Sequence, residues 1–377
     1  MKRTIATDPA GRSGPVGAAS SHDSESSDPP IAIIRVHYPL TAGRMILRCE
    51  PGWTTDIEAD RASRNRELHE FRLPLSGPFT YFKPLIVDDG AQRWSMGDNY
   101  LALASRKAAV DIYPYFRADE TCSACELREL ADETGRTHTF RVFYPPGYHE
   151  NTLRRYPVLY MQDGQNLFFP NEAFGGQHWR VAETLGVLDA MNACEQAIVV
   201  GIYPSARERD YTQPGYDAYG RFLVQALKPH VDLDFRTLTG PQHTAVMGSS
   251  LGGVVSFYLA WQYPHVFGMA ACMSSTFGWR DDLRQRVVRE ARRNLRIYLD
   301  SGWPRDNYEV TRDMRTLLHD RGFREGIDLH YYAFPEATHN ERAWAMRCHL
   351  PFQLFFGQTA SMHAPADTAS MRMEATP

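Results

Sequence analysis

The chain has 377 residues, of which 43% are hydrophobic and 12% aromatic, so it can bury the cores of two domains. Its formal net charge of −4 argues against a nucleic-acid partner, which would select a strongly basic surface. No apolar run approaches the length of a membrane span, and the first residues lack the apolar core of a secretory signal. We therefore expect a cytoplasmic protein without a membrane partner.

The two ends of the chain have a composition typical of disorder. Residues 1–29 are rich in Ser, Asp, Gly, Pro and Ala and contain almost no large apolar side chains, and residues 358–377 are similar. Such segments cannot bury enough apolar surface to offset the entropy lost on ordering. We expect both to be disordered tails.

Short β-like segments separated by turns occupy residues 30–116. Strands are expected at residues 31–36, 43–48, 68–75 and 80–87. No stretch of this region shows sustained helical periodicity. Several short strands at regular spacing predict a small β-sandwich domain.

Residues 117–135 are rich in Glu and Arg and are expected to form a linker. They contain Cys122-x-x-Cys125, which is one half of a zinc or redox motif without a second half. Ordinary free thiols are favoured over a metal or redox role. Cys194 and Cys272 lie in apolar runs and are expected to be small buried hydrophobic residues.

From residue 136 to residue 357 the pattern changes to alternating strands and helices. Strands are expected at 139–144, 158–161, 197–202, 244–247, 269–273, 296–299 and 330–334. Helices are expected at 180–191, 216–231, 251–263, 281–290, 307–321 and 340–355. This alternation predicts an α/β domain with a mostly parallel sheet covered on both faces. Reactive residues should follow the carboxyl ends of its strands.

The segment Gly248-Ser249-Ser250-Leu251-Gly252 lies between a predicted strand and a predicted helix. G-x-S-x-G at such a turn is typical of a nucleophile elbow, in which a strained turn exposes the serine hydroxyl. The flanking positions are small because neighbouring backbone passes close by. Ser250 is therefore the candidate nucleophile.

A serine nucleophile needs a base, and an acid to orient that base. Of the histidines after Ser250, only His339 directly follows a predicted strand and precedes the last helix, so it is the candidate base. The alternatives lie in helices, within a strand, close behind the elbow helix or in the tail: His265, His319, His330, His349 and His363. The acid stays open between Asp306, which is favoured because its loop can reach the next loop, and Asp300 at a strand end. Glu309 is a third choice.

An oxyanion hole requires two backbone N–H groups, one from the residue after the nucleophile and one from the loop after an earlier strand. Leu251 supplies the first candidate. Gln165, in Asp163-Gly164-Gln165-Asn166, supplies the second, although an ordinary Asp-Gly turn would have the same sequence.

Four further residues lie in loops where a substrate would bind: Arg207, Arg209, Trp179 and Trp303. The arginines could pair with an anionic or catechol-bearing group. Exposed arginines in loops are more often simply solvated, so this role is one of two interpretations.

Four separated motifs resemble the esterase branch of the α/β-hydrolase superfamily, which includes enterochelin esterase, feruloyl and acetyl-xylan esterases and S-formylglutathione hydrolase. They are the Tyr156–Phe168 segment, Arg207–Thr212, the Gly248–Gly253 elbow and Thr338–Glu341. The resemblance covers roughly residues 136–356. It implies an α/β-hydrolase fold and a serine hydrolase with Ser250 as nucleophile, His339 as base and an acid in the loop after Gly302. That loop is longer here than is usual in the family.

The N-terminal region is similar to the immunoglobulin-like domains that precede some esterases and glycan-active enzymes. The similarity is carried by three motifs, Trp53–Asp56, Tyr81–Lys83 and Trp94–Tyr100. An immunoglobulin-like sandwich before such a catalytic domain resembles the enterochelin esterase arrangement.

Together these features predict a serine-dependent carboxylic ester hydrolase that needs no metal or organic cofactor. Its substrate would be a small-molecule or glycan ester, of siderophore, feruloyl or acetyl type. Two alternatives remain at this point. One is an acyltransferase that passes the acyl group to an alcohol or sugar, and the other is a catalytically idle binding protein on a hydrolase scaffold.

Overall fold

The computed structural model describes residues 29–104, 108–118 and 124–357. The tails for which the sequence predicts disorder lie outside these ranges except for residue 29, and so does Cys122 of the Cys-x-x-Cys pair. Within these ranges, no helix is long and apolar enough to cross a membrane.

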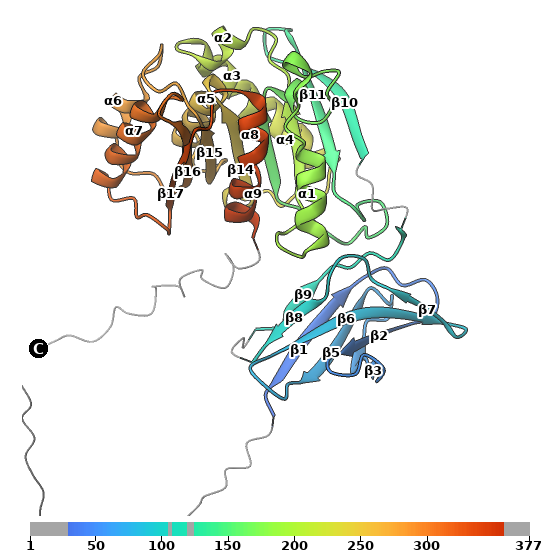
Figure 1. The fold of residues 1–377 in the computed structure, drawn as a ribbon. Coiled ribbons are helices and arrows are strands. Elements are labelled where there is room, and N and C mark those ends of the chain that lie inside the picture. Colours follow the sequence, from blue (N-terminus) through green and yellow to red (C-terminus); the bar gives the residue numbers. More distant parts are fainter. Residues whose placement is uncertain (1–28, 105–107, 119–123, 358–377) are drawn as a thin grey trace, which may run out of the picture.

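Two sheets form the N-terminal part of the molecule (Figure 1). One has the strand order β4-β5-β1-β9, and the other has the order β3-β2-β6-β7 with β8 also paired to β6. Their inward-facing side chains share one core, which includes Val36 of β1, Leu47 of β2 and Phe82 of β6. The predicted small β-sandwich is confirmed. Its strands are β1 (Ile31–His37), β2 (Arg44–Cys49), β3 (Ile57–Glu58), β4 (Arg61–Ala62), β5 (Leu68–Pro74), β6 (Phe79–Asp88), β7 (Ala91–Trp94), β8 (Tyr100–Leu103) and β9 (Val110–Ile112).

The rest of the described chain is built on an eight-stranded sheet with the order β10-β11-β13-β12-β14-β15-β16-β17. β10 and β11 are antiparallel to their neighbours, and all pairs from β13 onward are parallel. The carboxyl ends of six strands therefore share one edge of the sheet. The strands are β10 (Ala124–Ala131), β11 (Thr137–Tyr144), β12 (Val158–Gln162), β13 (Ile198–Ile202), β14 (Thr244–Ser249), β15 (Met269–Met273), β16 (Arg296–Trp303) and β17 (Leu329–Pro335).

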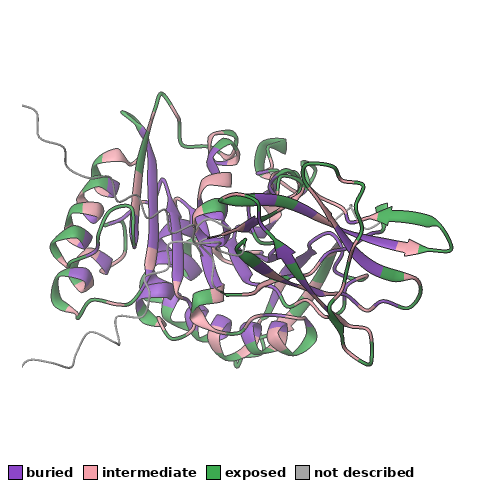
Figure 2. Cartoon of the chain, turned by 90° about the horizontal axis from the view of Figure 1, so that it is seen from below, coloured by how far each residue is buried: buried purple, intermediate pink, exposed green. Residues whose placement is uncertain are grey.

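Helices cover both faces of this sheet (Figure 1). Successive strand residues point to opposite faces, so Tyr160 packs with α3–α7 on one side while Met161 packs with α1, α8 and α9 on the other. Buried residues accordingly concentrate in the strands, whereas the outer helix surfaces are exposed (Figure 2). The helices are α1 (Val181–Ala190), α2 (Arg207–Tyr211), α3 (Gly215–Phe222), α4 (Lys228–Asp234), α5 (Leu251–Gln262), α6 (Leu283–Arg289), α7 (Tyr308–Asp320), α8 (Glu341–Arg347) and α9 (His349–Phe356).

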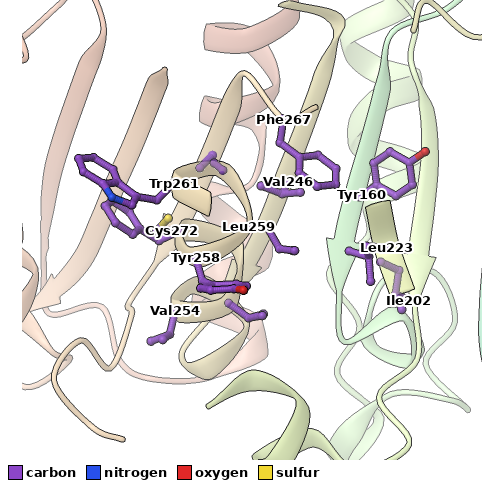
Figure 3. Packing of buried hydrophobic residues seen from close by; sticks show 14 of the residues in the cluster. Tyr160, Ile202, Leu223, Val246, Val254, Tyr258, Leu259, Trp261, Phe267 and Cys272 are labelled. Carbon is purple, nitrogen blue, oxygen red and sulfur yellow. The ribbon is translucent and has the colours of Figure 1, made fainter. Parts of the chain in front are cut away.

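Helix α5 is buried on almost all sides, and this fixes the turn that precedes it. Eleven of its twelve residues are buried, among them Val254, Tyr258 and Trp261 (Figure 3). Because α5 contacts both β14 and β15, the serine at its first turn is held rigidly against the sheet edge.

Two expectations about elements need correction, and the expected helix over 216–231 is confirmed with one added detail. The segment assigned to a linker contains β10, an edge strand whose charged residues face solvent. Edge strands often carry such charges. They give β10 the composition of a linker, so the sequence pattern did not indicate a strand. The expected single helix over 340–355 is divided at Cys348 into α8 and α9, because Pro351 cannot donate the next helical hydrogen bond. The expected helix over 216–231 contains a π-helical turn at Leu223–Leu227, followed by Pro229 in α4.

Polar contacts join the sandwich to the sheet domain. Glu150 accepts hydrogen bonds from the Tyr38 hydroxyl (2.8 Å) and from the backbone N–H groups of Phe116 and Arg117 (both 2.9 Å). The buried Asn151 side chain donates to the carbonyls of His37 (2.9 Å) and Pro114 (2.8 Å).

We expect Glu150→Ala to lower the free energy of unfolding by about 2 kcal/mol, because three donors lose a charged acceptor. Urea denaturation measures this change, with Glu129→Ala on the exposed face of β10 as the control. A stability equal to that of the wild type would show that these contacts do not hold the two parts together.

Candidate active site

Ser250 lies at the turn between β14 and α5 in a backbone conformation that non-glycine residues rarely adopt. Its φ is 56° and its ψ is −122°, and its N–H donates to the Met273 carbonyl at 2.9 Å. Such strain costs on the order of 1–3 kcal/mol and is found mainly at functional sites. A Cβ atom on Gly248 would lie 2.5 Å from the Gly252 backbone, so the turn requires glycine there. The chain therefore has the local geometry of a nucleophile elbow.

His339 and Asp306 are in direct contact. His339 follows β17 and Asp306 follows β16, and the His339 Nδ1 atom lies 2.6 Å from Asp306 Oδ1. The Asp306 side chain is fully buried, whereas the His339 ring is partly exposed. An ionised carboxylate only accepts hydrogen bonds, so Nδ1 carries the proton and Nε2 is left free to accept one.

The environment of Asp306 favours its charged form. Burial alone would raise the pKa of this carboxyl, but hydrogen bonds from His339, Ser274 and the Gly302 N–H hold the pKa below its usual value. A carboxylate that stays ionised can stabilise an imidazolium next to it.

Ser250 lies at the same edge of the sheet, since it directly follows β14. Among the interactions of the described residues, no hydrogen bond joins its hydroxyl to His339. Catalytic hydrogen bonds often tighten only when a substrate is bound. The structure thus joins His339 and Asp306 directly and places Ser250 at the end of β14, which β15 separates from β16 in the sheet.

Asp300 has other partners. Its side chain is fully buried and forms two hydrogen bonds with Arg347 (3.0 and 3.1 Å) and one with the Tyr298 hydroxyl (2.7 Å). Burial raises the pKa of Asp300 despite the nearby arginine. Between the two open choices for the acid, the carboxylate that contacts His339 is Asp306.

The two candidate oxyanion donors come from α5 and from the loop after β12. Leu251 is the first residue of α5, and Gln165 is the middle residue of a short 3-10 helix, η2 (Gly164–Asn166). Neither N–H can find an acceptor inside its own helix at these positions. A Cβ atom on Gly164 would lie 2.6 Å from the Gly201 backbone, so this loop packs tightly on β13.

Arg207 holds the candidate oxyanion loop, residues 163–166, which carries Gln165. Its guanidinium donates to both carboxylate oxygens of Asp163 (2.7 and 2.9 Å), and the Asp163 N–H donates to the Tyr211 hydroxyl at 3.1 Å. Asp163 has a positive φ of 55° and directly precedes η2. The sequence interpretation of Arg207 as a substrate-binding residue did not foresee that its Nε and Nη2 groups are both bonded to Asp163.

We expect Arg207→Ala to lower kcat by about tenfold, because a loosened η2 misplaces one oxyanion donor. This loss is smaller than the loss of kcat of about 10²–10³-fold that follows complete removal of such a donor. Arg207→Lys should recover only part of this loss, since lysine cannot form the two-pronged contact. Steady-state kinetics measure both. Arg221→Ala is the matched control, because Arg221 in α3 is exposed and pairs with the exposed Glu133 at 3.4 Å. Equal kcat in all three variants would contradict the assignment.

The remaining candidate substrate-binding residues are placed differently from one another. Trp303 ends β16 and is 48% exposed at the carboxyl edge of the sheet. Trp179 is only 1% exposed and packs against Trp344, with ring centroids 5.9 Å apart. Its burial corrects the expectation that Trp179 contacts substrate. Because apolar neighbours surround its large ring, it belongs to the core under α1.

Sequence reasoning missed three residues behind Asp306, namely Ser274, Trp344 and Arg347. All three are buried and linked by hydrogen bonds. A signal was present for two of them. In the predicted last helix, Arg347 follows Trp344 by three residues, which puts a charged residue on the apolar face.

A surface cavity of about 530 Å³ lies elsewhere. Its lining includes Gln242, Gly268 and Arg296, which precede or begin β14, β15 and β16. It is therefore at the amino ends of the parallel strands, at the edge opposite Ser250, where ligands of such sheets do not usually bind.

A family model described as "Putative esterase" matches residues 131–348, which is more than half of the chain. The chain belongs to this Esterase family. The matched segment contains all three residues of the Ser250, Asp306 and His339 set together with the oxyanion loop, whereas the β-sandwich precedes it.

Curated proteins and solved structures resemble the chain at low sequence identity. The uncharacterized protein YjcH of Bacillus subtilis is 28% identical over 148 residues, which are 38% of this chain and 58% of YjcH. The chain thus spans less than two thirds of that relative.

Two solved structures share the fold. A ferulic acid esterase has a TM-score of 0.53 at 17% identity, covering 62% of this chain and 98% of its own. The enterobactin esterase FES of Shigella flexneri has a TM-score of 0.52 at 14% identity, covering 86% of this chain and 92% of its own. These likenesses establish the α/β-hydrolase fold.

Proposed function

We propose that this protein hydrolyses carboxylic esters through an acyl-enzyme formed on Ser250. The observation that carries the proposal is the contact between His339 Nδ1 and the buried Asp306 carboxylate, at the same edge of the sheet as a serine in a strained elbow. Membership of the Esterase family supports the same class of reaction.

In the proposed mechanism the Ser250 Oγ atom attacks the ester carbonyl carbon while His339 Nε2 takes the hydroxyl proton. Asp306 stabilises the imidazolium that forms. The tetrahedral oxyanion accepts hydrogen bonds from the Leu251 and Gln165 N–H groups. His339 returns its proton to the departing alcohol as the C–O bond breaks, and then activates a water molecule that releases the acid from Ser250.

We further propose an ester with an aromatic group as the substrate, of feruloyl or catechol-siderophore type. Three large aromatic side chains are exposed in segments that end or follow β12, β15 and β16: Phe174 (76%), Trp279 (46%) and Trp303 (48%). Exposed aromatic faces at a binding edge favour stacking with flat ring systems. The likeness to a ferulic acid esterase and to an enterobactin esterase is consistent with this class.

Product analysis tests this function. The wild type is incubated with p-nitrophenyl acetate and with methyl ferulate, with and without an added acceptor alcohol. We expect free carboxylic acid in both cases. If the acyl group were transferred mainly to the added alcohol, the protein would be an acyltransferase and not a hydrolase. No turnover, together with no labelling by a fluorophosphonate probe, would favour the idle binding protein.

A further inference from the structure

The Ser274 hydroxyl lies at a junction directly behind Asp306. Ser274 follows β15 and is fully buried. Its Oγ atom is 2.5 Å from Asp306 Oδ2, 2.9 Å from Arg347 Nη2 and 3.0 Å from Trp344 Nε1. Asp306 lies in the loop after β16 and Arg347 lies in α8, so Ser274 connects this loop to that helix.

The direction of each hydrogen bond at this junction follows from chemistry. An indole N–H and a guanidinium can only donate, so Trp344 and Arg347 occupy the two lone pairs of the Ser274 oxygen. The single hydroxyl hydrogen then has Asp306 Oδ2 as its acceptor. Ser274 is therefore a donor of fixed direction toward the catalytic carboxylate.

This donor determines which oxygen of Asp306 is available to His339. Oδ2 accepts from Ser274 and from the Gly302 N–H at 2.8 Å, whereas Oδ1 faces His339 Nδ1 at 2.6 Å. A rotation of the carboxylate would break both anchoring bonds. The imidazole thus meets a carboxylate of fixed orientation.

Arg347 is itself held in place by Asp300. Its guanidinium is 4% exposed and forms two hydrogen bonds with the fully buried Asp300, at 3.0 and 3.1 Å. It also lies 3.9 Å from Asp306 Oδ2. A buried cation requires such a partner, so Asp300 serves as the counterion that keeps Arg347 aimed at Ser274.

We propose that Ser274 is a positioning residue for Asp306, aligned by Arg347 and Trp344. This inference rests on the proposed function, because it assigns a role within the same Ser250, His339 and Asp306 set. In this arrangement the two aspartates have different roles. Asp306 contacts His339, whereas Asp300 holds Arg347, which in turn donates to Ser274.

Ser274→Ala is expected to lower kcat about tenfold with KM unchanged, the effect of losing one hydrogen bond to a charged group. The acid limb of the pH profile of kcat/KM should move up by roughly half a unit. A carboxylate with one donor fewer binds the imidazolium more strongly. Among the charged groups near the ring, Asp306 contacts Nδ1, the Arg347–Asp300 pair lies behind Asp306, and Glu341 begins α8 two residues after His339.

A proton resonance gives a second readout. The low-field signal of the His339 Nδ1 proton should shift in Ser274→Ala, because its acceptor has changed. Arg347→Lys should reduce kcat in the same direction, since lysine cannot bind both oxygens of Asp300 and also reach Ser274. Ser301→Ala is the matched control, because Ser301 is a buried serine in β16 whose hydroxyl has no partner among the described residues.

The experiment uses the full chain with p-nitrophenyl acetate, after fluorophosphonate labelling of the wild type at Ser250 has been established. An unlabelled wild type would mean that the proposed function has failed. A labelled wild type with a Ser274→Ala variant of unchanged kcat, acid limb and resonance would overturn the positioning role, whatever the loss in melting temperature.

Discussion

Replacement of Ser250 by alanine is expected to lower kcat/KM for p-nitrophenyl acetate by at least about 10⁴-fold, the scale of the effect when a triad nucleophile is removed. The variant keeps Leu251 and Gln165, so oxyanion stabilisation persists without a nucleophile. Initial rates at saturating and limiting substrate measure the loss.

Ser256→Ala is the control for this variant. Ser256 lies in α5 six residues after the nucleophile, is fully buried, and has a hydroxyl without a partner in the described part of the chain. Its removal should leave kcat/KM within about twofold of the wild type, since a buried unpaired hydroxyl contributes little to stability. Wild-type activity in Ser250→Ala would exclude the elbow serine as nucleophile.

Replacement of Asp306 by asparagine is expected to reduce kcat by about 10⁴-fold, with little change in KM. An amide cannot stabilise the imidazolium, and it can hold the ring in the wrong tautomer. This is the outcome of the equivalent change in a Ser-His-Asp protease. The pH profile of the residual activity distinguishes a lost acid from a general loss of structure, because the acid limb should move to lower pH.

Asp300→Asn provides the contrast between the two aspartates. It removes the carboxylate that forms two hydrogen bonds with the buried Arg347 guanidinium and leaves Asp306, at 3.9 Å, as its remaining ion-pair partner among the described residues, so the free energy of unfolding should fall by about 3–5 kcal/mol. The loss of kcat in the fraction that folds should stay near tenfold. If folded Asp300→Asn lost as much activity as Asp306→Asn, the choice of Asp306 as the acid would be contradicted.

Local sequence signals predicted the fold class and the position of Ser250. The elbow depends only on contacts within a few residues, and strand–helix alternation is carried by hydrophobic periodicity. His339 could be placed at a strand end for the same reason.

The choice between Asp306 and Asp300 could not be made from the sequence. Asp300 lies in β16, and Asp306 follows the strand by three residues. Asp306 contacts the loop after β17, whereas Asp300 contacts α8. Long-range packing also decides the burial of Trp179, whose ring could have faced either the core or the substrate. Periodicity carries no information on such contacts.

Two further features were hidden for physical reasons. β10 is an edge strand with charges on its exposed face, which gives it the composition of a linker. The partners of Arg207 lie in the Asp163 loop, more than forty residues earlier, so that an arginine at a strand end appeared free to bind an anion.

The central claim is that an acyl group is carried by Ser250 during turnover. The most direct measurement is acid quenching during hydrolysis of p-nitrophenyl acetate, followed by peptide mass mapping of the protein. One acetyl group is expected on the peptide that contains Ser250, and none on that peptide in Ser250→Ala. Turnover with no acetyl group on that peptide, or with the acetyl group on another side chain, would contradict it.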